Sequence, residues 1–172
     1  MPPPPPLVFM MGRSPVFLPT DLRYARQHMW IDARKNGDWL GACDVPVPLF
    51  STRIGFTTYA VKLIGDPIAL RWKVGVGDPI MAGKPIGHIE GSKAVSDLFA
   101  PVDGTLEAIN DDVLQDLNSI QWNPYEAWLL SVRTSETASD ERASDFSAEE
   151  YQSHLEAVWP LTERLLKGRK GD

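Results

Sequence analysis

The sequence predicts a mostly β domain of the sandwich or barrel kind, with small flanking helices and one C-terminal helix. Three observations support this prediction. Short apolar runs between residues 22 and 133 are cut by Gly, Pro and Asp about every eight to twelve residues, as in all-β domains. That range shows no long helical period. After residue 147, apolar residues recur at helical spacing.

Composition narrows the class of protein. The chain has 172 residues, 43% of them hydrophobic and 23% charged, which fits one globular domain with tails. Its net charge of -6 argues against a nucleic-acid partner, because phosphate backbones attract basic proteins. The one cysteine, Cys43, excludes an internal disulfide and a cysteine-rich zinc site. We expect a cytoplasmic protein that does not bind membranes.

Residues 1–20 are expected to form a flexible, proline-rich leader. Five consecutive prolines follow Met1, and such a composition is typical of polyproline II or disordered segments. The apolar run from 7 to 11 lacks the basic flank and the length of a signal peptide. A ligand for a proline-recognising partner is the alternative.

Residues 21–133 should form the β domain. Short strands bounded by turn residues are expected at Ile54–Thr57, Ile68–Trp72, Pro85–Glu90 and Thr105–Ile109. Short helices are expected at Tyr59–Ile64 and Val113–Leu117, the second of them after the N-cap candidates Asn110–Asp112.

The C-terminal part should be a linker followed by a helix. Residues 134–146 are rich in Ser, Thr, Ala and acid, so we expect a solvated linker. Residues 147–172 should form a helical tail, because Ser147 and Glu150 have the spacing of a capping box. Pro160 should break or kink this helix. The apolar stripe of the helix predicts either packing on the domain or a docking surface.

The pair Ser92–Lys93 lies between two strand-like segments and should therefore form the tip of a β-hairpin. A lysine at such a tip presents its ammonium group to solvent and to a modifying enzyme. Glu90 and Asp97 are carboxylates that could orient the lysine or be recognised by that enzyme, and the small Ser92 leaves room for it. The alternative is an ordinary surface lysine.

Here the sequence resembles the lipoyl and biotinyl carrier domains, most closely the H protein of the glycine cleavage system. The resemblance covers roughly residues 22–133. It rests on the following segments, in order: Leu22-Arg23-Tyr24, His28, Trp30, Ile54-Gly55-Phe56-Thr57, Tyr59-Ala60, Gly65-Asp66, Glu90-Gly91-Ser92-Lys93-Ala94, Ser96-Asp97-Leu98, Pro101-Val102, Gly104, Asn110, Asn123-Pro124-Tyr125 and Trp128-Leu129. The helix after Ser147 also resembles the family's C-terminal helix.

The resemblance implies a barrel-sandwich hybrid that carries lipoate covalently on Lys93 and is not an enzyme. A lipoate ligase or lipoyltransferase would attach the group, with Glu90, Ser92 and Asp97 recognised at the hairpin. A monomer would then shuttle an aminomethyl group among a pyridoxal-phosphate glycine decarboxylase, an aminomethyltransferase and dihydrolipoyl dehydrogenase. Biotin is disfavoured, because the lysine is flanked by Ser92 and Ala94 rather than by methionines.

Several positions depart from the family pattern. Three residues, Met29, Thr58 and Leu63, replace residues that are usually polar. In the family, the first and last of these positions lie near the lipoyl-lysine arm when it carries the aminomethyl group and is folded back. Ser92 replaces the usual Val. These departures leave open a divergent lipoate-binding carrier outside glycine cleavage, for example in sulfur oxidation, or an unmodified interaction scaffold.

An insertion of roughly a dozen residues lies within the segment 32–53, which is longer than the family's first hairpin. Its apolar residues should either cap the sandwich or form a patch that faces a partner: Val45, Val47, Leu49 and Phe50. The three histidines, His28, His88 and His154, lie in separate segments without the spacing of a zinc site, so we expect packing or surface roles.

Overall fold

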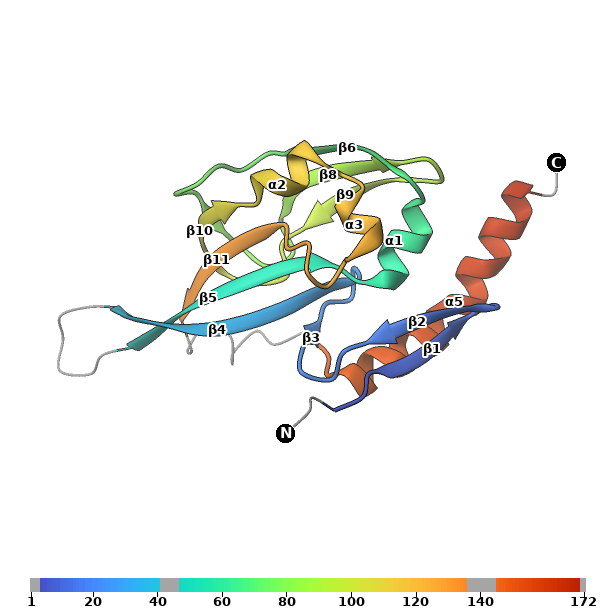
Figure 1. Ribbon diagram of the computed structural model, residues 1–172, viewed down its shortest axis with the longest axis horizontal. Coiled ribbons are helices and arrows are strands. Elements are labelled where there is room, and N and C mark those ends of the chain that lie inside the picture. The colour runs from blue at the N-terminus through green and yellow to red at the C-terminus, as the bar shows by residue number, and fades with distance from the viewer. Residues whose placement is uncertain (1–3, 41–46, 136–144, 171–172) are drawn as a thin grey trace.

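The computed structural model describes residues 4–40, 47–135 and 145–170, together with their side chains except those of 35–40, 47–48 and 168–170 (Figure 1). Its strands form three antiparallel sheets, accompanied by small helices and one long C-terminal helix, so the predicted fold class is confirmed. Within these ranges, no helix combines the length and the apolar character needed to cross a membrane.

Two sheets enclose the main core. The larger sheet contains, in spatial order, β3 (Arg23–Tyr24), β4 (Met29–Leu40), β5 (Val47–Phe56), β11 (Leu130–Ser135), β10 (Gly104–Ile109) and β7 (Pro79–Ile80). The smaller sheet contains β6 (Pro67–Trp72), β8 (Pro85–Gly91) and β9 (Val95–Phe99), and it lies above the larger one in Figure 1. Apolar side chains from both sheets, among them Ile54, Ile89 and Leu106, are almost completely inaccessible and belong to one cluster.

The small helices begin where polar side chains cap them. Thr57 caps α1 (Thr58–Ile64), because its Oγ1 accepts the Ala60 amide at 3.2 Å. Asn110 caps α2 (Asp111–Gln115) through the Asp112 amide, also at 3.2 Å. Both helices were predicted. A third short helix, α3 (Ser119–Trp122), was not predicted, and it has no side-chain cap.

The prediction of a flexible leader over residues 1–20 is wrong for most of its length. β1 (Leu7–Met11) and β2 (Ser14–Leu18) form a hairpin that turns at Gly12, whose φ is +66°. Alternate residues point inward and are buried: Phe9, Met11, Val16 and Leu18. The two short apolar runs on either side of Gly12 were a usable hairpin signal that the proline-rich composition obscured.

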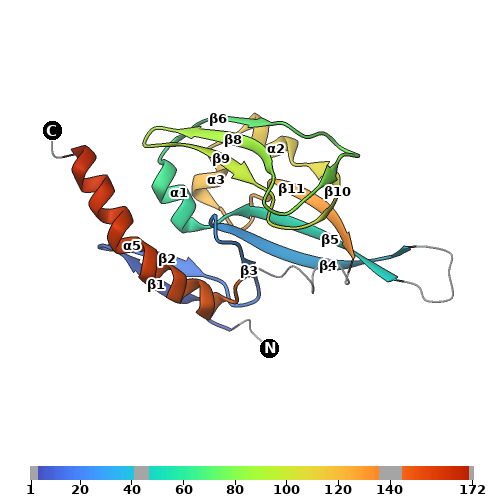
Figure 2. The same ribbon diagram turned by 180° about the vertical axis from the view of Figure 1, so that it is seen from behind.

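The hairpin packs on α5 (Ala148–Lys170), and the pair lies beside the two-sheet body (Figure 2). Their buried side chains form a second core cluster with Trp30 and Tyr59 of the body. Side chains also bind the carbonyls at both edges of the hairpin. Gln152 Nε2 donates to Val8 O at 2.9 Å, Lys62 Nζ donates to Pro15 O at 2.8 Å, and Tyr125 Oη donates to Phe17 O.

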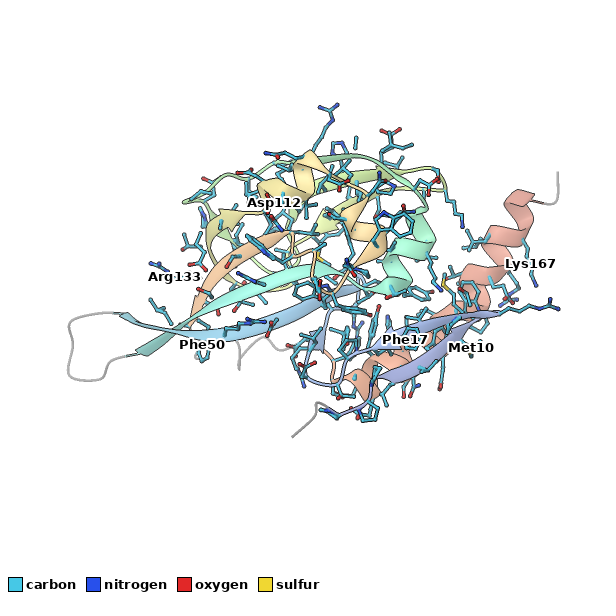
Figure 3. The ribbon with its side chains drawn as sticks, in the orientation of Figure 1. Met10, Phe17, Phe50, Asp112, Arg133 and Lys167 are labelled. Atoms are coloured by element: carbon cyan, nitrogen blue, oxygen red, sulfur yellow. The ribbon has the colours of Figure 1, made fainter. Side chains whose placement is uncertain are left out.

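The outer face of the hairpin is apolar as well. Met10 and Phe17 lie on this face with about half of their surface exposed, 52% and 49% respectively (Figure 3). The register pairs Val8 with Phe17 and Met10 with Pro15, so four apolar side chains share the face.

The capping box that begins α5 is confirmed. The Glu150 amide donates to Ser147 Oγ at 3.2 Å, and the Ser147 amide donates to Glu150 Oε1 at 3.0 Å. The helix does not break at Pro160 but continues to Lys170. The carbonyl that Pro160 leaves without its helical donor belongs to Glu156, an exposed residue, so water can replace the missing N–H.

Two other predicted boundaries also shift. The 32–53 insertion extends existing strands, because β4 and β5 pair as far as Leu40 and Val47. Leu49 is buried and Phe50 half-buried, while Val45 lies outside the described residues.

The 134–146 linker is shorter than predicted, because β11 includes Thr134 and Ser135, and Phe146 pairs with Tyr24 through backbone bonds of 2.7 and 2.8 Å. The linker's residues 136–144 lie outside the described part of the chain.

Candidate functional site

The hairpin between β8 and β9 places Lys93 at an exposed tip, as predicted. Glu90 pairs with Val95 at the end of the ladder, and the Gly91 amide donates to Ala94 O at 2.8 Å to close the turn. Ser92 and Lys93 are both exposed. A primary amine on a defined turn is therefore open to solvent, which is what acylation by a second protein requires.

The tip is bound to the C-terminal end of α1. The Lys93 amide donates to Ile64 O at 2.9 Å, and the Ser92 amide donates to Asp66 O at 2.8 Å. In return, the Asp66 amide donates to Ser92 Oγ at 2.9 Å. Gly91 fits because a Cβ there would lie only 2.1 Å from Ile64 O. The lysine hairpin is thus held in place by main-chain bonds to a neighbouring helix.

The predicted recognition residues lie around Lys93 but do not contact it. Glu90 is exposed at the end of β8, and Asp97 is exposed opposite His88. Within the described residues, neither carboxylate forms an ion pair or hydrogen bond with the Lys93 ammonium. The idea that they orient the lysine therefore gains no support from the structure, while their exposure leaves both open to an enzyme that approaches the hairpin.

The departures Met29 and Leu63 lie in two different cores. Met29 is 1% exposed and belongs to the main cluster, opposite Phe56. Leu63 is half-buried and packs into the second cluster. Thr58 is half-buried at the start of α1, and its amide donates to Tyr125 Oη at 3.4 Å. The apolar side chain of Met29 is therefore a packing element, and a carboxylate in its place would be buried.

Two of the histidines that are distant in sequence come together in the structure. The His28 and His154 rings lie 6.0 Å apart, and His28 Nδ1 lies 2.8 Å from Tyr151 Oη. Burial and then the neighbouring His154 lower the pKa of His28 to about 4. Burial also lowers the pKa of His154. No local pattern predicts this contact, because the two histidines are 126 positions apart.

This contact joins the C-terminal helix to the body. Thr57 Oγ1, which caps α1, also lies 3.2 Å from Tyr151 Oη. The Tyr151 ring stacks on the Tyr24 ring with centroids 4.7 Å apart. Among the described residues, no group of three or more His, Cys, Asp or Glu side chains is placed to hold a metal ion. The contacts of Tyr151 and His154 with Tyr24, His28 and Thr57 attach α5 to the two-sheet body.

A cleft lies away from the lysine hairpin and includes none of its tip residues. It is lined by Ala25, Arg26, Gln27, Ala82, Gly83, Ala100, Pro101 and Asp145. In the part of the chain that the structure describes, Lys93 is therefore an exposed amine on a hairpin bound to α1, outside the residues that line this cleft.

Comparison with known proteins places the chain in one family. The model of the glycine cleavage H-protein family matches residues 22–158. The glycine cleavage system H protein of Streptomyces coelicolor is 33% identical over 134 residues, covering 77% of this chain and 93% of that protein. The one from Mycobacterium avium is 35% identical over 141 residues, covering 80% and 96%.

A solved structure agrees with these matches. The crystal structure of a glycine cleavage system H protein from Mycobacterium marinum is similar with a TM-score of 0.62 and 33% identity, and the match covers 79% of this chain and 97% of that one. The β1–β2 hairpin and the last twelve residues of α5 lie outside the family match.

Proposed function

Because the chain belongs to the glycine cleavage H-protein family, whose members are carriers rather than catalysts, we propose that it bears lipoate on Lys93. The observation that supports this most strongly is the exposed Lys93 at the tip of a hairpin whose backbone is bound to α1. A lipoate ligase or lipoyltransferase would attach the group and would recognise Glu90, Ser92 and Asp97 around the tip.

Attachment forms one amide bond. Lys93 Nζ loses a proton and attacks the activated carboxyl carbon of the lipoyl group, and the activating group leaves with its electron pair. The lysine thereby loses its positive charge, which leaves Glu90 and Asp97 as an acidic border near the arm. The bound lipoyl group supplies a disulfide on a long arm that can move between partner active sites.

We further propose that the cargo is the aminomethyl group of glycine. The carrier would take it from the pyridoxal-phosphate glycine decarboxylase, deliver it to the aminomethyltransferase and be reoxidised by dihydrolipoyl dehydrogenase, in the cytoplasm. The identity to H proteins over nearly their whole length supports these partners.

Intact mass tests the attachment. Co-expressed with a lipoate ligase and supplied with lipoate, the wild-type protein should gain the mass of one lipoyl group, and the Lys93→Arg variant should gain none. Lys84→Arg is the matched control, because Lys84 is also an exposed lysine in a turn, and it should be modified like the wild type. An unmodified wild-type protein, beside a modified control carrier, would favour the interaction scaffold.

A second candidate, a carrier outside glycine cleavage, rests on Met29 and Leu63. Both side chains are apolar and packed into cores, so they offer no hydrogen bond to an amine-bearing arm. A reconstituted glycine decarboxylation and bicarbonate-exchange assay separates the candidates. Turnover by the lipoylated protein would support the glycine role. Confirmed lipoylation without turnover would support the alternative.

A further inference from the structure

The Ser92 side chain takes part in a closed ring of hydrogen bonds with Asp66. The backbone amide of Ser92 donates to Asp66 O at 2.8 Å, and Ser92 Oγ accepts a hydrogen bond from the Asp66 amide at 2.9 Å. Asp66 is itself held from another helix, because Gln121 Nε2 of α3 donates to Asp66 Oδ1 at 2.8 Å. Ser92 therefore connects the hairpin tip to α1 and α3 together.

We propose that Ser92 is a positioning residue for Lys93, acting through Asp66. This role rests on the proposed lipoylation of Lys93. Gly65 and Asp66 directly follow Ile64, the last residue of α1, and the Lys93 amide donates to Ile64 O. The segment from Ile64 to Asp66 therefore accepts bonds from both tip residues. Two main-chain bonds thus hold the tip on one short segment, and the bond from the Asp66 amide to Ser92 Oγ is the further contact that restricts rotation of the tip about them.

The aliphatic part of the Lys93 side chain also lies against this segment, at Gly65. Gly65 has a φ of +77°, and a Cβ built there would lie 2.4 Å from Ser92 Oγ and 2.8 Å from Lys93 Cγ. The serine hydroxyl and the lysine stem therefore lie against the same glycine backbone. Loss of the hydroxyl would free the tip to rotate about the remaining bonds and would change the direction in which the lysine leaves the surface.

The hydroxyl should affect order at the tip more than the stability of the fold. Both Ser92 and Asp66 are exposed, so water can replace the lost acceptor when Ser92 is changed. The tip would then sample further conformations. When only a fraction of the molecules has the competent tip, the apparent affinity of the attaching enzyme falls by that fraction, while the rate from the bound state is unchanged.

Three variants test this role. With the apo-protein as the varied substrate of a lipoate ligase, Ser92→Ala should raise KM by roughly threefold to tenfold with kcat within about twofold. Hydrogen exchange of the Asp66 amide should become about tenfold faster or more. Ser92→Thr retains the hydroxyl and should restore both values. Ser96→Ala is the matched control, because Ser96 is an exposed hairpin serine whose Oγ donates to the adjacent Asp97 O.

The outcomes separate this role from the proposed function. A modified wild-type protein with unchanged KM in Ser92→Ala, or a Ser92→Thr variant that restores neither value, would overturn the positioning role alone. An increase in KM without faster Asp66 exchange would also overturn it, because Ser92 would then act only through recognition by the enzyme and not by positioning the tip. A wild-type protein that takes up no lipoyl group would overturn the proposed function and this role with it.

Discussion

Gly91 marks the closest approach of the lysine hairpin to α1. An added Cβ would lie 2.1 Å from Ile64 O and 2.8 Å from its carbonyl carbon, both of them backbone atoms that cannot move alone. Gly91→Ala should therefore lower the free energy of unfolding by about 1 to 3 kcal/mol. Urea denaturation measures this. Gly75→Ala is the control, because its nearest neighbour is Asp78 Oδ2 at 4.0 Å, and equal losses in both variants would contradict the steric argument.

The half-buried His28 should make the protein sensitive to acid. Its pKa is about 4 in the folded protein, against about 6.5 in an unfolded chain. Between these values the unfolded chain binds a proton that the folded protein does not. The contribution of His28 to the free energy of unfolding is therefore fully present above about pH 6.5 and is lost as the pH decreases towards 4. The loss should reach about 2 to 3 kcal/mol.

The groups around His28 point to the matched variant. His28 has a φ of +68°, a conformation that Asn tolerates well, and it faces Tyr151, Tyr59 and His154. We expect His28→Asn to be less stable than the wild type at pH 7.5 but to lose less stability on acidification to pH 5. Urea denaturation at the two pH values measures the difference. Equal acid losses in both proteins would assign the effect to other groups.

At the scale of the element, α5 depends on its capping box. Ser147→Ala removes the acceptor of the Glu150 amide and should cost about 1 kcal/mol. Ser153→Ala is the control, because Ser153 is an exposed position inside the same helix, where alanine should be neutral or slightly stabilising. Hydrogen exchange along α5, together with urea denaturation, distinguishes them. A cost in Ser153→Ala as large as in Ser147→Ala would argue against the cap.

At the scale of the whole molecule, the protein has two cores that differ in their relation to the lysine hairpin. β8, β9 and much of α1 contribute to the main cluster, whereas the β1–β2 hairpin and α5 form the second with Trp30 and Tyr59. Stability of α5 and carrier activity should consequently be separable by truncation.

Deletion of residues 1–19 tests this separation. It removes four buried apolar side chains, so Tm should fall by roughly 10 °C and α5 should exchange rapidly. The rate of Lys93 lipoylation should stay within a few-fold of the wild-type rate, because the hydrogen bonds of the Ser92–Lys93 tip go to Ile64 and Asp66 and not to the β1–β2 hairpin. Deletion of residues 1–5 is the control, because Pro4 and Pro5 are exposed, and it should preserve Tm. Loss of lipoylation in a folded 1–19 deletion would contradict the separation.

The sequence by itself determined the features that depend on neighbouring residues. The capping box at Ser147, the cap at Asn110 and the turn that exposes Lys93 all arise from residues within a few positions of one another. The order of apolar runs and turn residues also determined the β class. Local backbone preference and side-chain period are sufficient for these features, because each is satisfied inside one short segment.

Only the tertiary structure decided which distant surfaces meet. The inward face of residues 7–18 has a partner only because α5 lies beside it, and His28 becomes half-buried only because Tyr151, 123 positions later in the chain, packs against it. The bond from Ser92 to Asp66 likewise requires α1 and the lysine hairpin to approach through Gly65 and Gly91. A local pattern states that a face is apolar or that a hydroxyl is available, but the partner is chosen by the packing of the whole chain, where each buried surface must find its complement.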